Sequence, residues 1–364
     1  MKGLYFHIPF CLSKCGYCSF YSFAPSKEQK DEYLSSLLSH IDKWGAKGNF
    51  SFDSIYFGGG TPSVFGGERI VAVLKEANAA FDISHDCEIT VEVNPSSASE
   101  ELFSSLKKAG VNRISMGVQS AVSKERKAIG RHSDKEQVQK ALCLCKKYEI
   151  KNVSLDLMLG LPFQTPKSLE ESLDFILKSG CTHVSTYMLK IEEGTPLFKN
   201  QSAFSFPSED EVCDLYLKTG EILKKNGFEH YEISNFALPG FQSRHNNKYW
   251  QCEEYLGIGP SAHSFIDKKR FYYKNDFLSF LNGEEPIYDG DGGDEEEFVM
   301  LALRLSKGLV FDEYKARFKM DYPKEKLKAA AELQRHGLLT LSDSSINLTE
   351  KGFLLSNSII AKLT

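Results

Sequence analysis

The chain has 364 residues, of which 41% are hydrophobic and 26% charged, and its formal net charge at pH 7 is -5. This composition is typical of a globular protein with a buried core, and it excludes a disordered chain and a fibrous repeat. The length exceeds the roughly 250 to 300 residues at which a single core stops growing, so we expect two or three domains. Because the net charge is negative, we expect no nucleic acid as a partner.

The N-terminal segment lacks the features of a secretion signal. Its short apolar run is interrupted by His7 and Pro9, and no small-residue cleavage site follows. No stretch of the chain approaches the roughly 20 apolar residues of a membrane helix, so we expect a cytoplasmic protein without membrane insertion. Thiols stay reduced in that compartment, which predicts that the nine cysteines are buried side chains or ligands and not disulfides.

Short β-rich segments alternate with amphipathic stretches through the first half of the chain. The predicted strands are 4–8, 54–57, 88–93, 113–118, 153–159 and 184–189. The predicted helices are 27–44, 68–80, 99–109, 134–148 and 167–179. This alternation is typical of consecutive βα units that form a parallel sheet. Six units predict an α/β fold built on a partial (β/α)6 barrel.

The second half of the chain differs from the first in its residue composition. Residues 228–264 are rich in aromatic side chains and His, and residues 289–297 form an acidic, Gly-rich run that we predict to be a solvated linker. The tail from about 310 to 364 reads as two helices, two short strands and a helix, which suggests a winged-helix-like unit for packing or partner contact. The predicted domains are therefore a barrel (1–228), an α+β extension (229–290) and a winged-helix-like domain (291–364).

Three cysteines lie within eight residues, directly after the first predicted strand: Cys11, Cys15 and Cys18. This loop follows the carboxyl end of the strand, where barrel enzymes place their chemistry. A structural zinc site needs four ligands, usually in two close pairs, and no second pair with suitable spacing follows. Three thiolates suit a [4Fe-4S] cluster with one iron left open, and three unconnected buried cysteines are the remaining alternative. The ring of Tyr17 could contact an adenine.

The sequence HIPFCLSKCGYC, from His7 to Cys18, resembles the signature of the radical S-adenosylmethionine (SAM) superfamily, specifically its oxygen-independent coproporphyrinogen-III-oxidase-like branch. The resemblance implies that the three cysteines bind a [4Fe-4S] cluster and that SAM occupies the open iron. It also implies that the cluster reduces the sulfonium by one electron, releasing methionine and a 5′-deoxyadenosyl radical. An external electron donor is then required, and the sequence does not identify it.

Polar and glycine residues follow the successive predicted strands. Gly58, Gly59 and Gly60 have no side chain, which lets their backbone carbonyls approach an ammonium group. The guanidinium of Arg131 is suited to bind a carboxylate. Asp156 is the one acid in an apolar strand, so a ribose diol or a cation is expected beside it. The resemblance places the following residues in the SAM pocket: Tyr5, Gly59, Gly60, Thr61, Glu92, Gln119, Arg131 and Asp156. Met188, at the end of the sixth strand, is predicted to cover the adenine or to belong to the core.

Motifs in the second half separate two branches of this superfamily. Phe20 stands where the oxidases carry a further Cys, which argues against decarboxylation. The sequences YEISNFA (231–237), HNNKYW (245–250) and GIGPSAHS (257–264) resemble heme chaperones of the HemW type, whose H-N-x-x-Y-W motif is associated with heme binding. The resemblance implies that His245 ligates heme iron, with a structural role as the alternative. His263 is a less favoured ligand.

Three functions follow, in order of preference. The first is a SAM- and cluster-dependent carrier that binds heme and transfers it to an unidentified acceptor protein. The second is an oxygen-independent coproporphyrinogen III oxidase, which Phe20 disfavours. The third is a metal-sensing transcription regulator that uses the C-terminal domain, which the near balance of charges in the tail disfavours.

Overall fold

The computed structural model describes all 364 residues and is built around one sheet of twelve strands. The strand order is β12-β11-β10-β9-β1-β2-β3-β4-β5-β6-β8-β7. Six parallel strands form its middle: β1 (Lys2–Ile8), β2 (Ser51–Gly59), β3 (Asp82–Val93), β4 (Arg113–Gln119), β5 (Asn152–Leu159) and β6 (His183–Met188). These are the six predicted strands, and the predicted fold class is confirmed.

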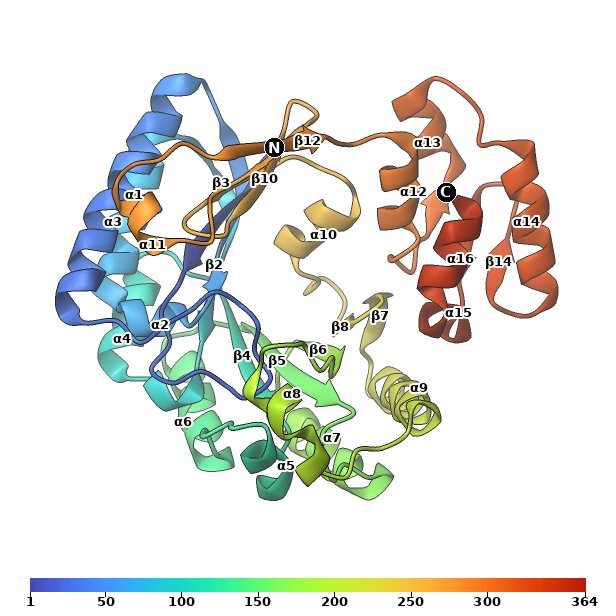
Figure 1. Ribbon diagram of the computed structural model, residues 1–364, viewed down its shortest axis with the longest axis horizontal. Coiled ribbons are helices and arrows are strands. Elements are labelled where there is room, and N and C mark those ends of the chain that lie inside the picture. Colours follow the sequence, from blue (N-terminus) through green and yellow to red (C-terminus); the bar gives the residue numbers. More distant parts are fainter.

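Five long helices connect these strands and cover the outer face of the curved sheet (Figure 1). They are α1 (Lys27–Lys47), α3 (Gly67–Ala80), α4 (Glu100–Lys108), α6 (Lys135–Lys147) and α7 (Pro166–Lys178). Short helices that the sequence did not predict follow three of the strands: α2 (Pro62–Phe65), η1 (Pro95–Ser97) and α5 (Ser123–Ala128). The helix starts are fixed locally, since Ser26 and Asp134 form capping boxes with the Gln three residues later.

The second half of the chain extends both edges of the barrel sheet. After α8 (Pro196–Asn200), η2 (Gln201–Ala203) and α9 (Glu209–Lys225), the strands β7 (Glu229–Glu232) and β8 (Asn235–Ala237) add beside β6. Beyond α10 (Arg244–Trp250), β9 (Tyr255–Ile258) pairs parallel with β1. The chain then adds β10 (His263–Ile266), β11 (Lys269–Tyr272), α11 (Phe277–Leu281) and β12 (Ile287–Asp291). The sheet therefore runs across the predicted domain boundary at residue 228.

The prediction of a solvated linker over 289–297 is wrong for most of its length. Residues 289–291 belong to β12, which pairs with β11, and residues 295–297 begin α12. The carboxylate of Glu297 binds Arg270 and accepts from the backbone N of Gly293. An acidic run can therefore sit in regular structure when a cation and backbone N–H groups compensate its charge.

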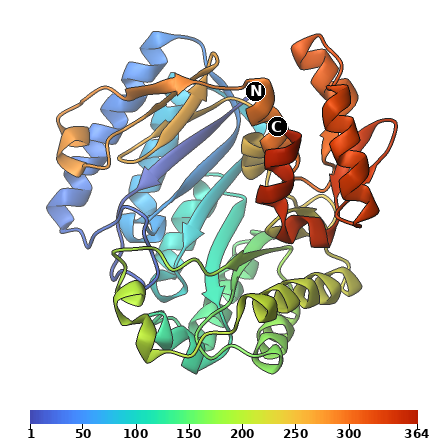
Figure 2. The ribbon, with the colours of Figure 1, turned by 45° about the vertical axis from the view of Figure 1, so that its right-hand side comes forward.

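The C-terminal residues form a small winged-helix-like unit at one side of the barrel (Figure 2). Its helices are α12 (Glu295–Ala302), α13 (Phe311–Phe318), α14 (Lys324–Arg335), α15 (Glu350–Leu354) and α16 (Ser356–Leu363). Its antiparallel strands, in the order β13-β15-β14, are β13 (Leu309–Val310), β15 (Ser345–Leu348) and β14 (Leu339–Leu341). None of the helices in the structure combines the length and apolar content of a bilayer-spanning segment.

The inner face of the barrel is polar, unlike the face that packs on the helices. Along β1, Leu4, Phe6 and Ile8 are fully buried against the outer helices, while Tyr5 and His7 point inward. Other inward side chains are also buried and polar: Ser54, Glu88, Arg113, Ser154 and His183. Buried polar groups cost free energy unless they are paired, so this face is built for polar contacts and not for core packing.

Candidate functional site

The cysteine loop is tied down at its base and at its tip. At the base, the backbone N of Cys11 donates to the Phe23 carbonyl at 2.9 Å. At the tip, the N of Gly16 donates to the Ile129 carbonyl at 2.9 Å, and the Gly16 carbonyl accepts from the N of Leu197 at 2.8 Å. The loop between β1 and α1 is therefore held by segments that follow β4 and β6.

The three thiols remain partly exposed within this anchored loop. All nine cysteines are free of disulfides, and Cys11, Cys15 and Cys18 are neither fully buried nor fully exposed. Nowhere in the structure do three His, Cys, Asp or Glu side chains converge in a way that could hold a single metal ion. In an iron–sulfur cube each thiolate binds a different iron, so the donor set suits a cluster and not a mononuclear ion.

A cavity of about 530 Å³ opens beside the thiols at the carboxyl ends of the strands. Eleven predicted residues line it: Cys11, Cys15, Tyr17, Cys18, Gly59, Gly60, Thr61, Glu92, Gln119, Arg131 and Asp156. Two of them contact the thiols, since Thr61 Oγ1 lies 3.3 Å from Cys11 Sγ and Arg131 Nη1 lies 3.8 Å from Cys15 Sγ. The structure thus brings together residues that are spread over about 145 positions of the sequence.

Three glycines shape this cavity, and each has a steric reason. Gly59 has a φ of 105°, and a Cβ there would lie 2.6 Å from the His7 ring. A Cβ on Gly60 would lie 2.7 Å from the Phe10 carbonyl oxygen. A Cβ on Gly117 would lie 2.6 Å from Gln119 Nε2, so its absence makes room for that side chain. Close packing against the His7 ring, the Phe10 backbone and the Gln119 side chain therefore favours glycine at these positions whether or not a ligand is bound.

Two carboxyl groups reach the cavity from β3 and β5, the strands on either side of β4. Burial and the nearby Asp156 together raise the pKa of Glu92 to about 7, although a hydrogen bond from Tyr56 opposes the shift. Burial also raises the pKa of Asp156 to about 6, although Ser185 and the guanidinium of Arg113 oppose the shift. Groups that titrate near neutral pH inside a cavity are typical of binding sites.

Gln119 and Arg131 carry the clearest signs of a missing ligand. Gln119 ends β4 in the left-handed region, with a φ of 66°, which is strained for a residue with a side chain. Its Oε1 and the Nε of Arg131 are buried without a hydrogen-bond partner. The Arg131 Nη2 donates to the Gly117 carbonyl, which fixes the guanidinium. A carboxylate or hydroxyl ligand would satisfy these donors and acceptors, so the residues fit an amino-acid moiety such as that of SAM.

Three predicted site residues do not line the cavity. Tyr5 lies deeper in the barrel, with its hydroxyl 3.2 Å from His7 Nδ1. Met188 ends β6 with 41% of its surface exposed, and its neighbour Tyr187 lines the cavity in its place. His245 lies at the opposite, amino-terminal ends of the strands.

The sequence did not single out several residues that line the cavity. They are Ser115, Gly117, Met158, Tyr187, Lys14 and Lys190. Period-two alternation would have found three of them, because Ser115 and Gly117 share a face of β4 and Met158 follows Asp156 by two positions on β5.

His245 is enclosed in the floor of the barrel. Only 1% of its surface is exposed. Its Nδ1 lies 3.0 Å from Ser54 Oγ and its Nε2 lies 2.9 Å from the Tyr249 hydroxyl, so both ring nitrogens have partners. Burial lowers the pKa of His245 to about 3, which keeps the imidazole neutral. Heme ligation by His245 remains a prediction, and in this conformation neither nitrogen is free.

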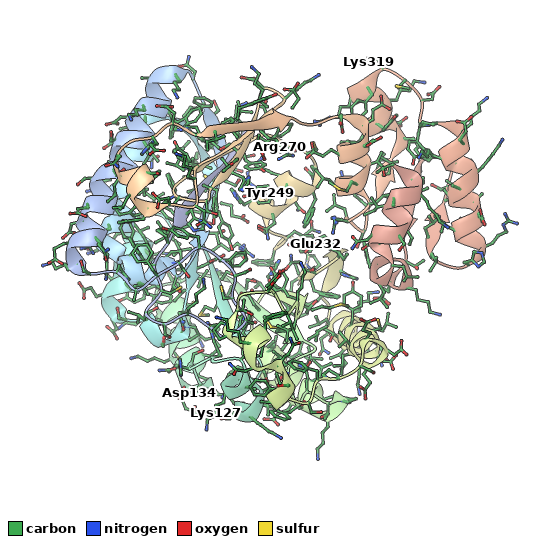
Figure 3. All side chains as sticks on the ribbon, viewed as in Figure 1. Lys127, Asp134, Glu232, Tyr249, Arg270 and Lys319 are labelled. Atoms are coloured by element: carbon green, nitrogen blue, oxygen red, sulfur yellow. The ribbon has the colours of Figure 1, made fainter.

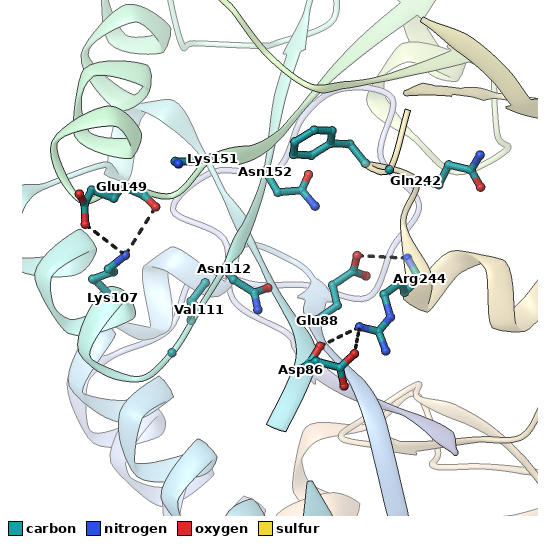
Figure 4. A pocket seen from close by; sticks show the side chains of 13 residues that line it. Asp86, Glu88, Lys107, Val111, Asn112, Glu149, Lys151, Asn152, Gln242 and Arg244 are labelled. Atoms are coloured by element: carbon teal, nitrogen blue, oxygen red, sulfur yellow. Dashed lines mark hydrogen bonds and ion pairs between the residues drawn. The ribbon is translucent and has the colours of Figure 1, made fainter. Parts of the chain in front are cut away.

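The same floor holds α10 through a buried carboxylate. Glu88 accepts hydrogen bonds from the backbone N atoms of Arg244 and His245, each at 3.1 Å, and Arg244 also pairs with Asp86 (Figure 4). A second hollow of about 450 Å³ adjoins these residues, and its lining is mostly charged and amide side chains. Most of those charges are already paired within the protein, as Figure 4 shows for Lys107 and Glu149.

Family models match two parts of the chain. The radical SAM superfamily model matches residues 5–176, and the model of the HemN C-terminal domain matches residues 295–355. A solved structure, coproporphyrinogen III oxidase (HemN) from Escherichia coli, superposes with a TM-score of 0.85 at 23% identity over 99% of this chain and 89% of that one. This likeness shows a common fold.

Relatives match over the full length. The heme chaperone HemW of Lactococcus lactis subsp. lactis (strain IL1403) is 34% identical over 99% of this chain and 97% of its own length. HemW of Bacillus subtilis (strain 168) is 32% identical over 99% and 98%. The mitochondrial radical S-adenosyl methionine domain-containing protein 1 of Bos taurus is 32% identical over 99% and 87%. The radical SAM domain implies a [4Fe-4S] cluster and SAM, which the cavity fits. The chain belongs to the radical SAM superfamily and, within it, to the HemW heme chaperone family.

Proposed function

We propose that this protein is a heme chaperone that holds a [4Fe-4S] cluster and SAM, binds heme and transfers it to an acceptor protein. The observation that carries the proposal is the cavity beside the three thiols, with its unpartnered Gln119 and Arg131, in a chain whose full-length relatives are named heme chaperones. The acceptor is a protein that takes up heme, and an external donor supplies the electron.

The proposed ligands follow from their positions in the cavity. Cys11, Cys15 and Cys18 bind three irons of the cluster. Arg131 holds the methionine carboxylate of SAM, the Oε1 of Gln119 accepts from a hydroxyl or ammonium group of SAM, and Glu92 accepts from the ammonium group. The remaining contacts involve the backbone of Gly59 and Gly60 with the ammonium, Thr61 beside the Cys11 thiolate, Asp156 with the ribose diol, and Tyr17 beside the nucleoside. Tyr5 and Met188 lie outside the cavity lining, so we assign them no contact with SAM.

When bound, the cluster supplies one electron to the sulfonium of SAM. The protein contributes position and a partly closed environment. The Arg131 guanidinium donates to Cys15 Sγ and to the Gly117 carbonyl, so it links the cluster loop to β4. The apolar side chain of Met158 and the ring of Tyr187 line the cavity and limit the access of water.

The first experiment tests the cluster. After anaerobic reconstitution with iron and sulfide, we expect about four irons per chain and a brown chromophore. Cys15→Ala should lose most of the iron and the colour. Cys143→Ala is the matched control, because that thiol is exposed on α6 and should leave the iron content unchanged. A Cys15→Ala protein with a full cluster would remove the ligand assignment.

The second experiment tests transport against oxidation. Titration with heme, followed by the Soret band, should show saturable binding, and apomyoglobin added afterwards should acquire the heme. Coproporphyrinogen III incubated with the reconstituted protein, SAM and a reductant should remain unchanged, because Phe20 occupies the position of the oxidases' extra Cys. The appearance of protoporphyrinogen IX, or the absence of any heme binding, would contradict the proposed function.

A further inference from the structure

The nine histidines differ in how well each could reach a ligand outside the protein. Four are exposed, namely His85, His132, His263 and His336, and the other five are buried or half-buried. Of the exposed four, only His263 packs on an aromatic ring: its imidazole stacks on Tyr272, with centroids 5.3 Å apart and an angle of 23° between the planes. An exposed imidazole can ligate heme iron, and an aromatic ring beside it offers apolar surface to a macrocycle.

His263 lies on the inner face of the sheet. In the parallel pair of β1 and β9, Tyr5 is paired in register with Gly257, and Gly3 is paired with Tyr255. Phe265 on β10 is level with Tyr255, and His263, two residues away, points to the same side. The imidazole therefore shares its face of the sheet with Tyr5.

The backbones of β9 and β10 lie close together at His263. A Cβ on Gly257 would lie 2.2 Å from the His263 carbonyl oxygen, so β9 and β10 approach each other in a way that only glycine allows. Neither ring nitrogen of His263 takes part in a hydrogen bond within the protein, whereas both nitrogens of His245 do. The Tyr272 ring packs on one face of the imidazole, and the His263 side chain is exposed.

The helix α10, which carries the HNNKYW motif, packs against this face of the sheet. The ring of Tyr249, on α10, packs edge-on against Tyr255 at 4.6 Å, and Arg270 donates to the Tyr255 hydroxyl at 3.1 Å. Tyr249 and Arg270 lie close together between the barrel and the C-terminal unit in Figure 3. His245 holds Tyr249 through its Nε2. The helix thus fixes β9 two residues before Gly257.

We propose that heme binds on the inner face of β9–β11, with its iron ligated by His263 and its macrocycle beside Tyr272, and that His245 is a positioning residue. This inference rests on the proposed function, because it assigns the ligand of a heme that the chaperone carries. It reverses the order of preference that the sequence motifs gave to the two histidines. The motif around His245 then contributes to heme binding through Tyr249 and Tyr255, without touching iron.

The test is a ferric heme titration of the full chain, with absorption and electron paramagnetic resonance spectra. His263→Ala should weaken binding roughly tenfold or more and abolish the low-spin imidazole signature. Added imidazole should restore that signature, because it replaces the missing ligand. Tyr272→Ala should weaken binding less and keep the signature. His336→Ala is the matched control, an exposed histidine without an aromatic partner, and should behave as the unsubstituted protein does.

His245→Ala separates the two assignments. We expect a lower melting temperature but an unchanged low-spin signature in the folded protein, and His245→Asn provides a milder variant if alanine prevents folding. Loss of the signature in folded His245→Ala or His245→Asn, with His263→Ala unaffected, would overturn the inference and leave the proposed function standing. If the unsubstituted protein binds no heme, the proposed function fails and the inference with it.

Discussion

At the scale of single residues, the two cavity carboxyl groups make the protein sensitive to pH. Glu92 has a raised pKa of about 7 in the folded chain, so between pH 4.5 and 7 the native state holds a proton that the unfolded state releases. Stability therefore falls as pH rises through this window, and the loss is complete above pH 7. The physical cause is the burial of a charge that Tyr56, Arg113 and the Gly59 backbone compensate only in part.

The first prediction concerns Glu92→Gln without ligands. The amide cannot ionise, so the variant should be more stable than the original protein at pH 8, by on the order of 2 kcal/mol, and nearly equal to it at pH 5. Urea unfolding at the two pH values measures the difference. Glu101→Gln, an exposed glutamate on α4, should show no such pH dependence. An equal effect of Glu92→Gln at both pH values would contradict the raised pKa.

The second prediction concerns Asp156 and SAM. Above its pKa of about 6 the ionised carboxylate can accept from two ribose hydroxyls, and below that pH it loses one acceptor. The affinity for SAM should therefore decrease as pH falls from 7.5 to 5. Calorimetric titration of the reconstituted protein should show Asp156→Asn binding roughly tenfold more weakly at pH 7.5, with the step near pH 6 removed. If Asp156→Asn still shows the decrease in SAM affinity near pH 6, another group causes that decrease.

At the scale of elements, α10 depends on a carboxylate from β3. Glu88 is 6% exposed, accepts from two backbone N atoms at the start of this short helix, and is the acidic group that most raises the pKa of the buried Arg113. A negative charge at a helix N-terminus is favourable, and removing an acid near a buried guanidinium leaves that charge less compensated.

The third prediction follows from this double role. Glu88→Ala should destabilise the protein by about 3 kcal/mol and speed hydrogen exchange in residues 244–250 before that in β1 or β2. Asp86→Ala is the matched control, since the carboxylate of this exposed residue contacts only Ser84 and Arg244, and the substitution should destabilise the protein far less. Unchanged exchange in α10 of Glu88→Ala would show that other contacts hold the helix.

The elements that could be predicted from the sequence are those that residue patterns within the element itself determine. The six barrel strands and five helices follow from period-two and 3.6-residue patterns, and the cap at Asp134 from its own neighbours. The pairing of β9 with β1 could not be predicted, because four residues near position 256 carry no signal for a partner some 250 positions away. For the same reason the motifs pointed to His245 without revealing that Ser54 and Tyr249 occupy its nitrogens.

At the scale of the whole molecule, the C-terminal unit joins the barrel through the free edge of β7. The backbone N of Ile233 donates to the Arg304 carbonyl at 2.9 Å, and the N of Ser306 donates to the Tyr231 carbonyl at 3.0 Å. Within the unit, the Asn347 amide donates to the Ser306 carbonyl at 3.0 Å. The segment that leads out of α12 thus covers an edge that would otherwise be open to pairing with another chain.

The fourth prediction tests this attachment with two substitutions at one position. Ser306→Pro removes the N–H that donates to Tyr231, and it should lower the melting temperature by several degrees and speed hydrogen exchange in residues 229–233. Ser306→Ala keeps that N–H and loses only the hydroxyl bond to the His230 carbonyl, so it should cost about 1 kcal/mol and leave the exchange of β7 nearly unchanged. Equal exchange in both variants would mean that side-chain packing, and not the backbone bonds at the strand edge, holds the unit on the barrel. Because β7 and β8 continue the sheet from β6, the same experiment shows whether loosening this edge reaches Tyr187 at the cavity.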